Sequence, residues 1–386
     1  MGYEFCVPHE IFSGDGAMDL AVRHISGHMS KAFIVTDGNM VRLGNCDSVI
    51  KKLQRSNISC QIFDEVNSEP VDAMVENGVK RYRQYECDGI VALGGGSCID
   101  CAKAIAVCVN SGVKITELAG KRISSPRPYF VAIPTTAGTG SEATQFTIIT
   151  DTKRKEKLLL SGPSLLPHMA IVDPFFTISV PSSISANTGV DALCHAMEAF
   201  TSRKSQPLSE VFAISAAKNI FKNLEQVCAN GHDINARAQM ALAATEAGIA
   251  FSNSSVTLIH GMSRPIGALF HVPHGLSNAI LLDVCVDFLS KGTALERFAE
   301  FSRRCGLSSR NDSDQNAVDA LTKKIHSLLS AINIPSIGSL ESIKRDVFIE
   351  NIPKMATDAI ASGSPANSIR TVKQQDIENL YKNLIG

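Results

Sequence analysis

Short apolar runs alternate with amphipathic stretches from the N-terminus to about residue 180. The runs end in Gly, Asp or Pro, which is typical of buried strands followed by turns. The stretches between them carry apolar residues at helical spacing. This alternation predicts a parallel sheet covered by helices, with ligand loops at the carboxyl ends of the strands. The expected strands are 31–36, 88–93 and 129–133, and the expected helices are 40–55 and 71–85.

The pattern changes after Pro181, where strands fade and long Ala-rich segments with helical periodicity take over. No repeat, low-complexity tract or flexible linker separates the two halves. The predicted domains are therefore 1–182, an α/β domain, and 183–386, an all-helical domain, with the site expected in a cleft between them. The expected helices of the second half are 189–201, 208–227, 235–250, 293–305, 316–331 and 374–384.

The composition narrows the expected binding partners and the expected cellular location of the protein. The 37 Lys and Arg nearly cancel the 38 Asp and Glu, so no basic field favours nucleic acid as a partner. The 11 cysteines are scattered through a long chain, which favours reduced thiols and a cytoplasmic location. Neither a signal peptide nor an apolar run long enough for a membrane span is expected.

Two polar loops follow neighbouring expected strands and are candidates for binding a dinucleotide. Gly94-Gly-Gly-Ser97 follows one strand and opens a helix, where backbone N–H groups can approach a pyrophosphate. The loop 134–142 offers hydroxyls and backbone donors after the next strand. Tight turns and helix capping are the structural alternatives for these loops. Asp37 ends an earlier strand, and its carboxylate would accept from a ribose and repel a 2′-phosphate, which favours NAD over NADP, although Asp-Gly is also an ordinary turn pair.

A candidate metal site lies in the helical half. Asp191 and His195 are four residues apart, which places a carboxylate and an imidazole on one helical face; a simple Asp–His hydrogen bond is the alternative. His260 and His274 flank a segment expected to be broken by Pro and Gly, so the chain could return both imidazoles to one point. One Asp and three His form an oxygen and nitrogen ligand set for Fe²⁺, Zn²⁺ or another first-row ion.

Four motifs in this order resemble the iron-containing (group III) alcohol dehydrogenases. They are the turn 94–100, the loop Thr135-Thr-Ala-Gly-Thr-Gly-Ser-Glu142, the helix Thr188-Gly-Val-Asp-Ala-Leu-Cys-His-Ala-Met-Glu198 and the segment from His260-Gly-Met262 to Pro273-His-Gly275. The resemblance spans nearly the whole chain. It implies that 1–182 is a Rossmann-like α/β dinucleotide-binding domain and that 183–386 is an all-helical metal-binding and substrate domain, as in the dehydroquinate synthase-like fold. It also implies NAD(H) as cofactor, one divalent metal with Fe²⁺ favoured over Zn²⁺, and a homodimer or larger homo-oligomer.

The motif positions also carry over the site residues of the family. The implied metal ligands are Asp191, His195, His260 and His274. The implied cofactor-contacting residues are Asp37, Gly95, Gly96, Ser97, Asp100, Thr135, Thr136 and Thr139, with Lys157 as a further cofactor-side lysine. A metal would act as a Lewis acid toward the alcohol oxygen, and the nicotinamide would accept the hydride.

Two further residues are candidate catalytic groups. His271, close to His274, would relay the released proton to solvent, or else it is an exposed loop histidine. Arg264 stands where many relatives have a second His four residues after His260. As a permanent cation it would either pair with an acidic neighbour or bind an anionic group of the substrate.

The expected activity is therefore an NAD(H)-linked, metal-dependent dehydrogenase that interconverts a small primary alcohol or diol and its aldehyde. One alternative is a hydroxy-acid or semialdehyde dehydrogenase that uses Arg264 for the carboxylate. A dehydroquinate synthase-like lyase is a second alternative, but its phosphorylated substrate needs several basic groups, and 240–285 contains only Arg264. The third alternative is a protein that binds a metal or a nucleotide without catalysis. The sequence does not single out the physiological substrate or the metal.

Overall fold

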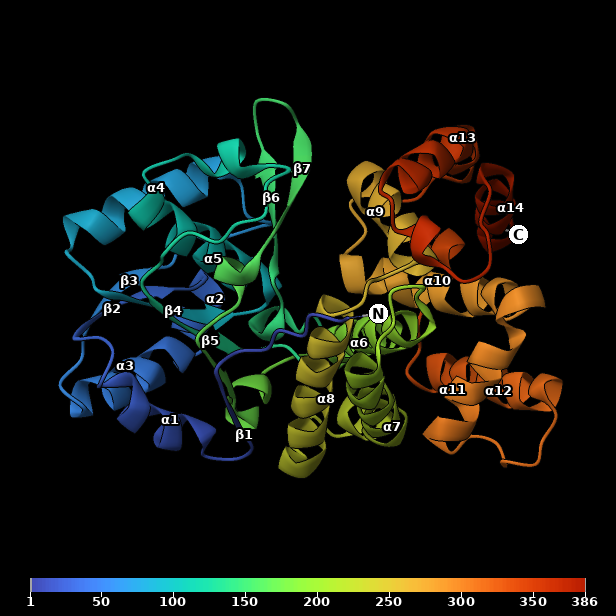
Figure 1. Ribbon diagram of the computed structural model, residues 1–386, viewed down its shortest axis with the longest axis horizontal. Coiled ribbons are helices and arrows are strands. Elements are labelled where there is room, and N and C mark those ends of the chain that lie inside the picture. Colours follow the sequence, from blue (N-terminus) through green and yellow to red (C-terminus); the bar gives the residue numbers. More distant parts are fainter. Residues whose placement is uncertain (1, 386) are drawn as a thin grey trace. The chain divides into compact units, whose positions relative to one another are not determined.

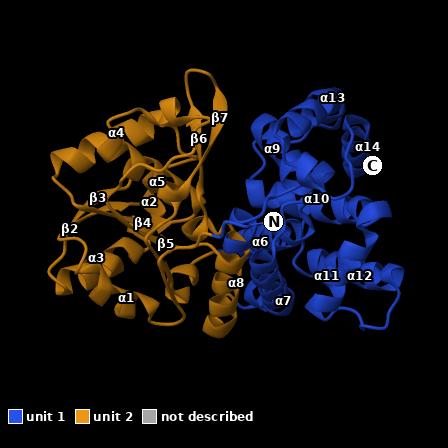
Figure 2. Ribbon diagram, viewed as in Figure 1, with its two compact units in different colours: residues 1–5, 181–230, 249–386 blue, residues 6–180, 231–248 orange. Residues whose placement is uncertain are grey.

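In a computed structural model of the protein, the structure is described for residues 2–385. Its internal contacts divide the chain into two compact units, coloured separately in Figure 2. Unit 1 comprises Met1–Phe5, Pro181–Asn230 and Ile249–Gly386, and unit 2 comprises Cys6–Val180 and Gly231–Gly248. The division at Pro181 lies beside the predicted one, whereas residues 231–248, expected in the helical domain, group with unit 2.

Unit 2 is built on a six-stranded parallel sheet with the order β1-β8-β5-β4-β2-β3 (Figure 1). These strands are β1 (Glu10–Ser13), β2 (Lys31–Val35), β3 (Ser59–Phe63), β4 (Gly89–Gly94), β5 (Tyr129–Pro134) and β8 (Met169–Val172). A separate antiparallel pair consists of β6 (Phe146–Asp151) and β7 (Glu156–Ser161). The three predicted strands are thus central members of the sheet, and the short or partly exposed strands were not expected.

Helices cover both faces of this sheet, because side chains of the buried strand β4 alternate between two cores. Ile90 and Ala92 pack into a core with α4 and α5, whereas Val91 and Leu93 pack into a core with α1 and α3. The helices are α1 (Ala17–Ile25), α2 (Gly38–Arg42), α3 (Asn45–Arg55), α4 (Asp72–Gln84) and α5 (Gly96–Ser111).

The helix expected over 40–55 is two helices, α2 and α3. Gly44 separates them with a φ of 77°, in the left-handed region that favours glycine, and it caps the start of α3. The apolar periodicity continues across the break, so it does not reveal the interruption.

Unit 1 is helical, with the largely buried α6 packed against α7 and α10. Its helices are α6 (Ser182–Thr201), α7 (Pro207–Ala229), α9 (Leu258–Phe270), α10 (His274–Leu289), α11 (Leu295–Cys305), α12 (Asp314–Ala331), α13 (Arg345–Ala361) and α14 (Gln374–Ile385). Short 3-10 turns occupy Ile115–Leu118, Ser141–Ala143, Pro163–Leu165, Pro174–Thr177, Gly292–Ala294, Ile337–Ser339 and Pro365–Asn367. Among residues 2–385, no helix combines the length and apolar content that crossing a bilayer requires.

Helix α8 (Ile234–Ser252) explains why 231–248 group with unit 2. Arg237 donates a hydrogen bond to the Val180 carbonyl at 2.9 Å, and Thr245 donates to the buried Glu142 carboxylate at 2.6 Å. Gly248 approaches Gly140 so closely that a Cβ on Gly248 would lie 2.5 Å from the Gly140 oxygen. Helical periodicity predicts the helix but not which core it joins.

Candidate metal centre and cofactor loops

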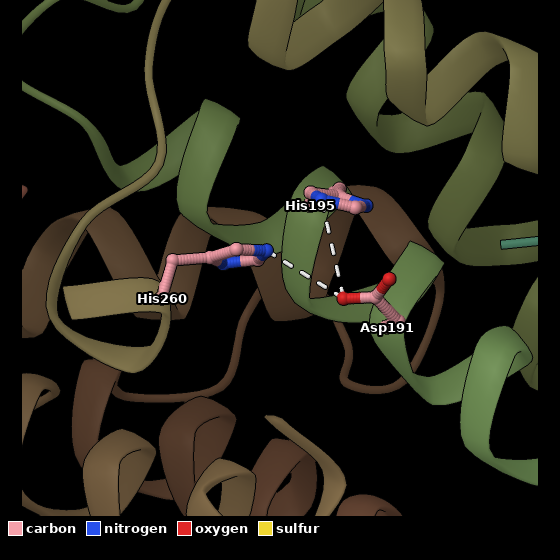
Figure 3. A group of neighbouring side chains, drawn as sticks. All are labelled: Asp191, His195 and His260. Carbon is pink, nitrogen blue, oxygen red and sulfur yellow. Dashed lines mark ion pairs between the residues drawn. The ribbon is translucent and has the colours of Figure 1, made fainter. Parts of the chain in front are cut away.

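Three buried side chains converge in unit 1, as Figure 3 shows. Asp191 and His195 lie one turn apart on α6, and His260 lies in the first turn of α9. The Nε2 atoms of His195 and His260 are 3.9 Å and 3.5 Å from Asp191 Oδ1. One ligand atom from each residue falls within 4.8 Å of the others, which is close enough for one ion to contact all three.

His274 adjoins this group from the start of α10. Its Nε2 lies 3.8 Å from Asp191 Oδ1, and its ring centroid lies 5.3 Å from that of His260. Its side chain is 44% exposed, compared with 3% for Asp191. The group is therefore accessible on the side of His274.

The segment between His260 and His274 is not broken where it was expected to be. Helix α9 runs through Pro265 and ends at Phe270, and the following His271 has a φ of 54°. Pro265 leaves a carbonyl in the preceding turn without its usual donor. Pro265 is buried, and the Tyr381 hydroxyl donates to the adjacent Met262 carbonyl at 2.6 Å, so the surrounding packing holds the helix together.

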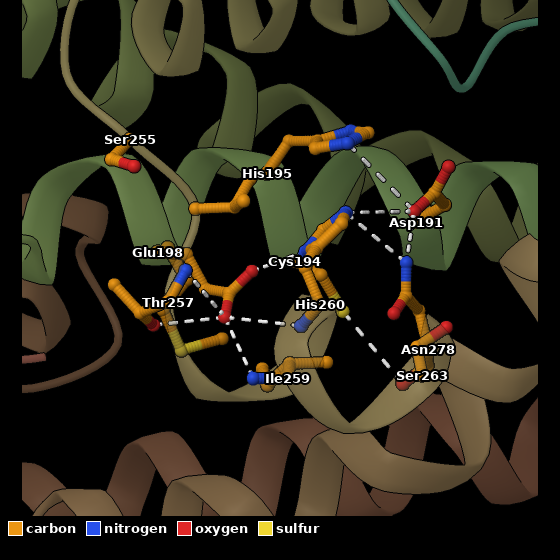
Figure 4. A network of polar contacts seen from close by, with 12 residues as sticks. Asp191, Cys194, His195, Glu198, Ser255, Thr257, Ile259, His260, Ser263 and Asn278 are labelled. Carbon is orange, nitrogen blue, oxygen red and sulfur yellow. Dashed lines mark hydrogen bonds and ion pairs between the residues drawn. The ribbon is translucent and has the colours of Figure 1, made fainter. Parts of the chain in front are cut away.

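Glu198 supports His260 from behind, and the sequence reasoning gave it no role (Figure 4). The His260 Nδ1–H donates to one Glu198 oxygen, which directs Nε2 toward Asp191. The other oxygen accepts from the Thr257 N–H and hydroxyl and from the Ile259 N–H, at 2.8–3.0 Å. A carboxylate behind a metal-binding imidazole fixes its tautomer and orientation.

Asn278 was also missed, although it follows His274 by one helical turn. Its Nδ2 donates to Asp191 Oδ1 at 2.6 Å and lies 3.2 Å from the Nε2 atoms of His260 and His274. The amide nitrogen thus contacts the acceptor atoms that a cation would contact. The i, i+4 spacing from His274 was the available signal.

The electrostatics favour a cation at Asp191 and His195, whereas at His260 an ion would have to displace a proton. Burial alone would raise the pKa of Asp191, but His195 and His274 outweigh it and hold that pKa below its usual range. Burial lowers the pKa of His195 to about 4, so its imidazole is neutral at pH 7 and keeps a lone pair for a metal. Burial also acts to lower the pKa of His260, but the Glu198 carboxylate reverses this and raises it to about 9.

The donor set fits a divalent transition metal better than Mg²⁺ or Ca²⁺. It offers one carboxylate oxygen and imidazole nitrogens, whereas the harder ions favour oxygen ligands throughout. The buried His195 Nδ1 has no hydrogen-bond partner among residues 2–385, and the ring stacks on Phe251 at 4.3 Å. The other ring nitrogen, Nε2, faces Asp191 and is the atom that would coordinate an ion.

The two predicted cofactor loops lie side by side in unit 2. Gly94 ends β4 with a φ of 153°, and a Cβ there would lie 2.5 Å from Cys98 Sγ. A Cβ on Gly95 would lie 3.6 Å from the Thr136 side chain, and one on Gly96 would lie 3.0 Å from Thr139. The glycine turn at the start of α5 therefore faces the threonine loop, and both follow adjacent strands, β4 and β5.

Comparisons with known proteins agree along the whole chain. The family model described as "Iron-containing alcohol dehydrogenase" matches residues 8–174, and the model for the C-terminal region of the Fe-containing alcohol dehydrogenase family matches residues 185–385. The chain belongs to the iron-containing alcohol dehydrogenase family. It is an oxidoreductase of this kind, as the motifs predicted.

Individual relatives cover nearly its full length. The NAD-dependent methanol dehydrogenase of Bacillus methanolicus is 33% identical over 99% of both chains. The crystal structure of a 1,3-propanediol oxidoreductase is 32% identical, covers 100% of both chains and superposes with a TM-score of 0.94. The sulfoacetaldehyde reductase of Bifidobacterium kashiwanohense, solved with NAD⁺, is 28% identical over 100% of this chain and 99% of that one, with a TM-score of 0.89. The predicted fold, an α/β unit and a helical unit, is that of this family.

Asp37 contacts Cys98, and this contact was not predicted from the sequence. Asp37 Oδ1 caps α2 by accepting from the N–H groups of Asn39 and Met40 at 2.7 Å and 3.2 Å. The Cys98 thiol donates to Oδ2 at 3.4 Å. Asp37 therefore points back toward the glycine turn and keeps acceptor capacity on Oδ2.

Asp100 joins the two loops to each other. Its Oδ1 accepts from the Ser141 hydroxyl at 2.5 Å, and its Oδ2 accepts from the Ile148 N–H at 3.0 Å. The buried Lys103, one turn later on α5, donates to the carbonyls of Thr144 and Phe146. These bonds fix the threonine loop against α5, and both Asp100 oxygens are engaged within the protein.

The remaining predicted residues are dispersed. Ser97 lies in the first turn of α5, and Thr135 is buried with its N–H bonded to the Gly94 carbonyl at 3.1 Å. Lys157 lies on β7, where its Nζ pairs with Glu69 at 2.6 Å. His271 is exposed at the end of α9, and Arg264 lies one turn after His260 on that helix.

Proposed function

We propose that this protein is an NAD(H)-linked, divalent-metal-dependent dehydrogenase that interconverts a small primary alcohol or diol and its aldehyde. The observation that carries the proposal is the buried convergence of Asp191, His195 and His260, with His274 beside them. The names of the relatives support the reaction class, because they act on methanol, 1,3-propanediol and sulfoacetaldehyde. NAD is supported by the methanol dehydrogenase, named as NAD-dependent, and by the reductase solved with NAD⁺.

Asp191, His195, His260 and His274 would hold the metal, with Fe²⁺ as the first candidate and Zn²⁺ as the second. When bound, a divalent ion supplies Lewis-acid stabilisation of negative charge on a substrate oxygen. Glu198 holds His260 with its Nε2 toward the ligand group, and Asn278 holds the Asp191 carboxylate. These two residues orient the ligands and do not themselves contact the reacting atoms.

The loops of unit 2 would bind the dinucleotide. The N–H groups of Gly95, Gly96 and Ser97 lie at the positive end of α5, which suits a pyrophosphate. Thr135, Thr136 and Thr139 would contribute from the facing loop, and Asp37 Oδ2 would accept from a ribose hydroxyl. Asp100 would act indirectly, by holding these loops together. Lys157 would contact the cofactor only if its ion pair with Glu69 broke.

His271 would carry the alcohol proton to solvent. It is exposed and follows the helix that supplies His260. Replacing it with glycine tests this role, because glycine tolerates the φ of 54° at this position. We expect His271→Gly to lower kcat about 10-fold to 100-fold at neutral pH, with partial rescue by added imidazole. An unchanged kcat would assign His271 to an exposed loop with no part in proton transfer.

A panel of alcohols and aldehydes with NAD(H) and NADP(H) tests the proposal as a whole. The protein is stripped of metal and reloaded separately with Fe²⁺, Zn²⁺ and Mn²⁺. We expect NADH formation that requires a metal and exceeds NADPH formation. Turnover that survives full chelation would overturn the metal mechanism, and bound metal and NAD without turnover of any substrate would favour a binding protein.

A further inference from the structure

Arg264 occupies an unusual position beside the candidate metal centre. It follows His260 by four residues on α9, so both side chains project from one face of the helix. One helical turn of about 6 Å separates their backbones. The side chain is half-buried, and burial lowers the pKa of its guanidinium group.

Arg264 makes no hydrogen bond or ion pair with any of residues 2–385. Other half-buried arginines of unit 1 are engaged: Arg297 with Glu210, Arg303 with Asp314, and Arg370 with the Phe288 carbonyl. Of the two roles predicted for Arg264, an ion pair with an acidic neighbour is therefore not seen within residues 2–385. A half-buried guanidinium has five donors that need partners.

The carboxylate that acts electrostatically on Arg264 already accepts several hydrogen bonds. Glu198 exerts an electrostatic effect on Arg264, but its oxygens accept from His260, Thr257 and Ile259. With a divalent ion bound, the two charges of that ion would balance Asp191 and Glu198. Arg264, one helical turn from His260, would then be a positive charge without a carboxylate of its own.

We propose that Arg264 determines substrate specificity by binding an anionic group, a carboxylate or sulfonate, at the far end of a short alcohol or aldehyde. This inference rests on the proposed function, since the other end of the same substrate would lie at the metal. The planar guanidinium matches the paired oxygens of such anions and forms two parallel hydrogen bonds with them. A neutral alcohol of the same length would not form these two bonds, and the guanidinium N–H groups would donate to water instead.

Matched pairs of substrates test the proposal by kinetics. The metal-loaded enzyme is assayed with 3-hydroxypropanoate against 1,3-propanediol, and with 2-hydroxyethanesulfonate against ethanol. We expect Arg264→Met to lower the anionic-to-neutral ratio of kcat/KM about 30-fold for whichever pairs are turned over. Arg264→Lys should keep part of the preference, because it keeps the charge but loses the planar fork. Arg370→Met is the matched control, and its ratio should equal that of the wild type. A ratio that Arg264→Met leaves unchanged would overturn the proposal.

A binding measurement separates this proposal from the proposed function. Calorimetric titration of metal-loaded protein with propanoate and with propanesulfonate needs no turnover. We expect Arg264→Met to weaken binding of at least one anion about 30-fold and Arg370→Met to leave it unchanged. If no substrate is oxidised or reduced, the dehydrogenase proposal fails, and this loss of binding still supports the anion site. Equal binding by wild type and Arg264→Met would overturn the anion site whatever the enzyme turns over.

Discussion

Histidines gather at two places in the molecule, and only one of them resembles a metal site. In unit 1, the rings of His195 and His260 have centroids 4.5 Å apart beside Asp191. In unit 2, His28 and His168 both stack on the Tyr129 ring, and their ring centroids lie 4.2 Å and 4.8 Å from its centroid. His9 packs edge-on against His168 at 5.7 Å. Spacing between rings is therefore similar in the two groups.

The charged neighbour differs. Asp191 lies at the centre of the first group, whereas the Arg127 guanidinium hydrogen-bonds to His168 in the second. The Phe130 N–H also donates to His168 Nδ1 at 2.9 Å. Burial and Arg127 lower the pKa of His168 to about 3, so the ring is neutral and its one acceptor nitrogen is used within the protein. Histidine proximity alone thus does not make a metal site; a carboxylate at the convergence point and a carboxylate behind the ring do.

The largest expected effect comes from removing one histidine from each group. His260→Ala should lower metal affinity more than about 100-fold, since loss of a supporting contact alone costs about 10-fold to 100-fold. His168→Ala should leave metal content unchanged. Metal content after gel filtration and NADH formation check both variants. Equal metal loss in the two would remove the distinction between the groups.

The carboxylate behind His260 gives the next largest effect. Glu198→Gln should lower metal affinity about 10-fold to 100-fold, because a neutral amide supports the imidazole less strongly. Chelator competition measures this affinity directly, and thermal unfolding of the metal-free variant shows whether the fold is intact. Unchanged affinity would mean that Glu198 only satisfies the N–H groups of the turn 257–259.

The histidine group of unit 2 should make the stability of the protein sensitive to acid. The pKa of His168 is about 3 in the folded protein and 6.5 without its environment. Between these values the unfolded chain binds the extra proton, so stability should fall as the pH drops from 6.5 toward 3. His168→Asn keeps an acceptor for the Phe130 N–H and does not titrate. Its free energy of unfolding should decline less steeply with falling pH, and an identical decline would assign the acid sensitivity elsewhere.

His271 belongs to neither group and should give the smallest effect on stability. A non-glycine residue with a φ of 54° is mildly strained. His271→Gly should therefore change the free energy of unfolding by less than about 1 kcal/mol, and the relief of strain favours a gain. Urea unfolding checks this value. A loss of several kcal/mol would show that His271 is a packing residue.

The sequence supports the overall architecture and the ligand set for different reasons. The strands 31–36, 88–93 and 129–133 are near-continuous apolar runs, which is how buried parallel strands appear in a sequence. Asp191 and His195 share a helix, so their spacing alone places them on one face. The family motifs then connect these residues to His260 and His274.

Other features depend on contacts that no local pattern records. Glu198 and Asn278 share helical faces with predicted ligands, but their partners lie far away in the sequence. Cys98 meets Asp37 only because β2 and β4 are neighbours in the sheet. Pro265 breaks helices in general, and α9 survives it through buried packing that includes Tyr381. Lys157 matched a motif position, and its partner Glu69 comes from a loop outside that motif.

The interruption of unit 2 by unit 1 has a consequence for biosynthesis. Residues 6–180 leave the ribosome as a continuous stretch, but Ala241, which packs with Ala170 and Val172, emerges only after 181–230. Domains tend to fold as units during synthesis, N-terminal first. Here unit 2 waits for a helix that follows part of unit 1, so the order of translation ties the maturation of unit 2 to that of unit 1.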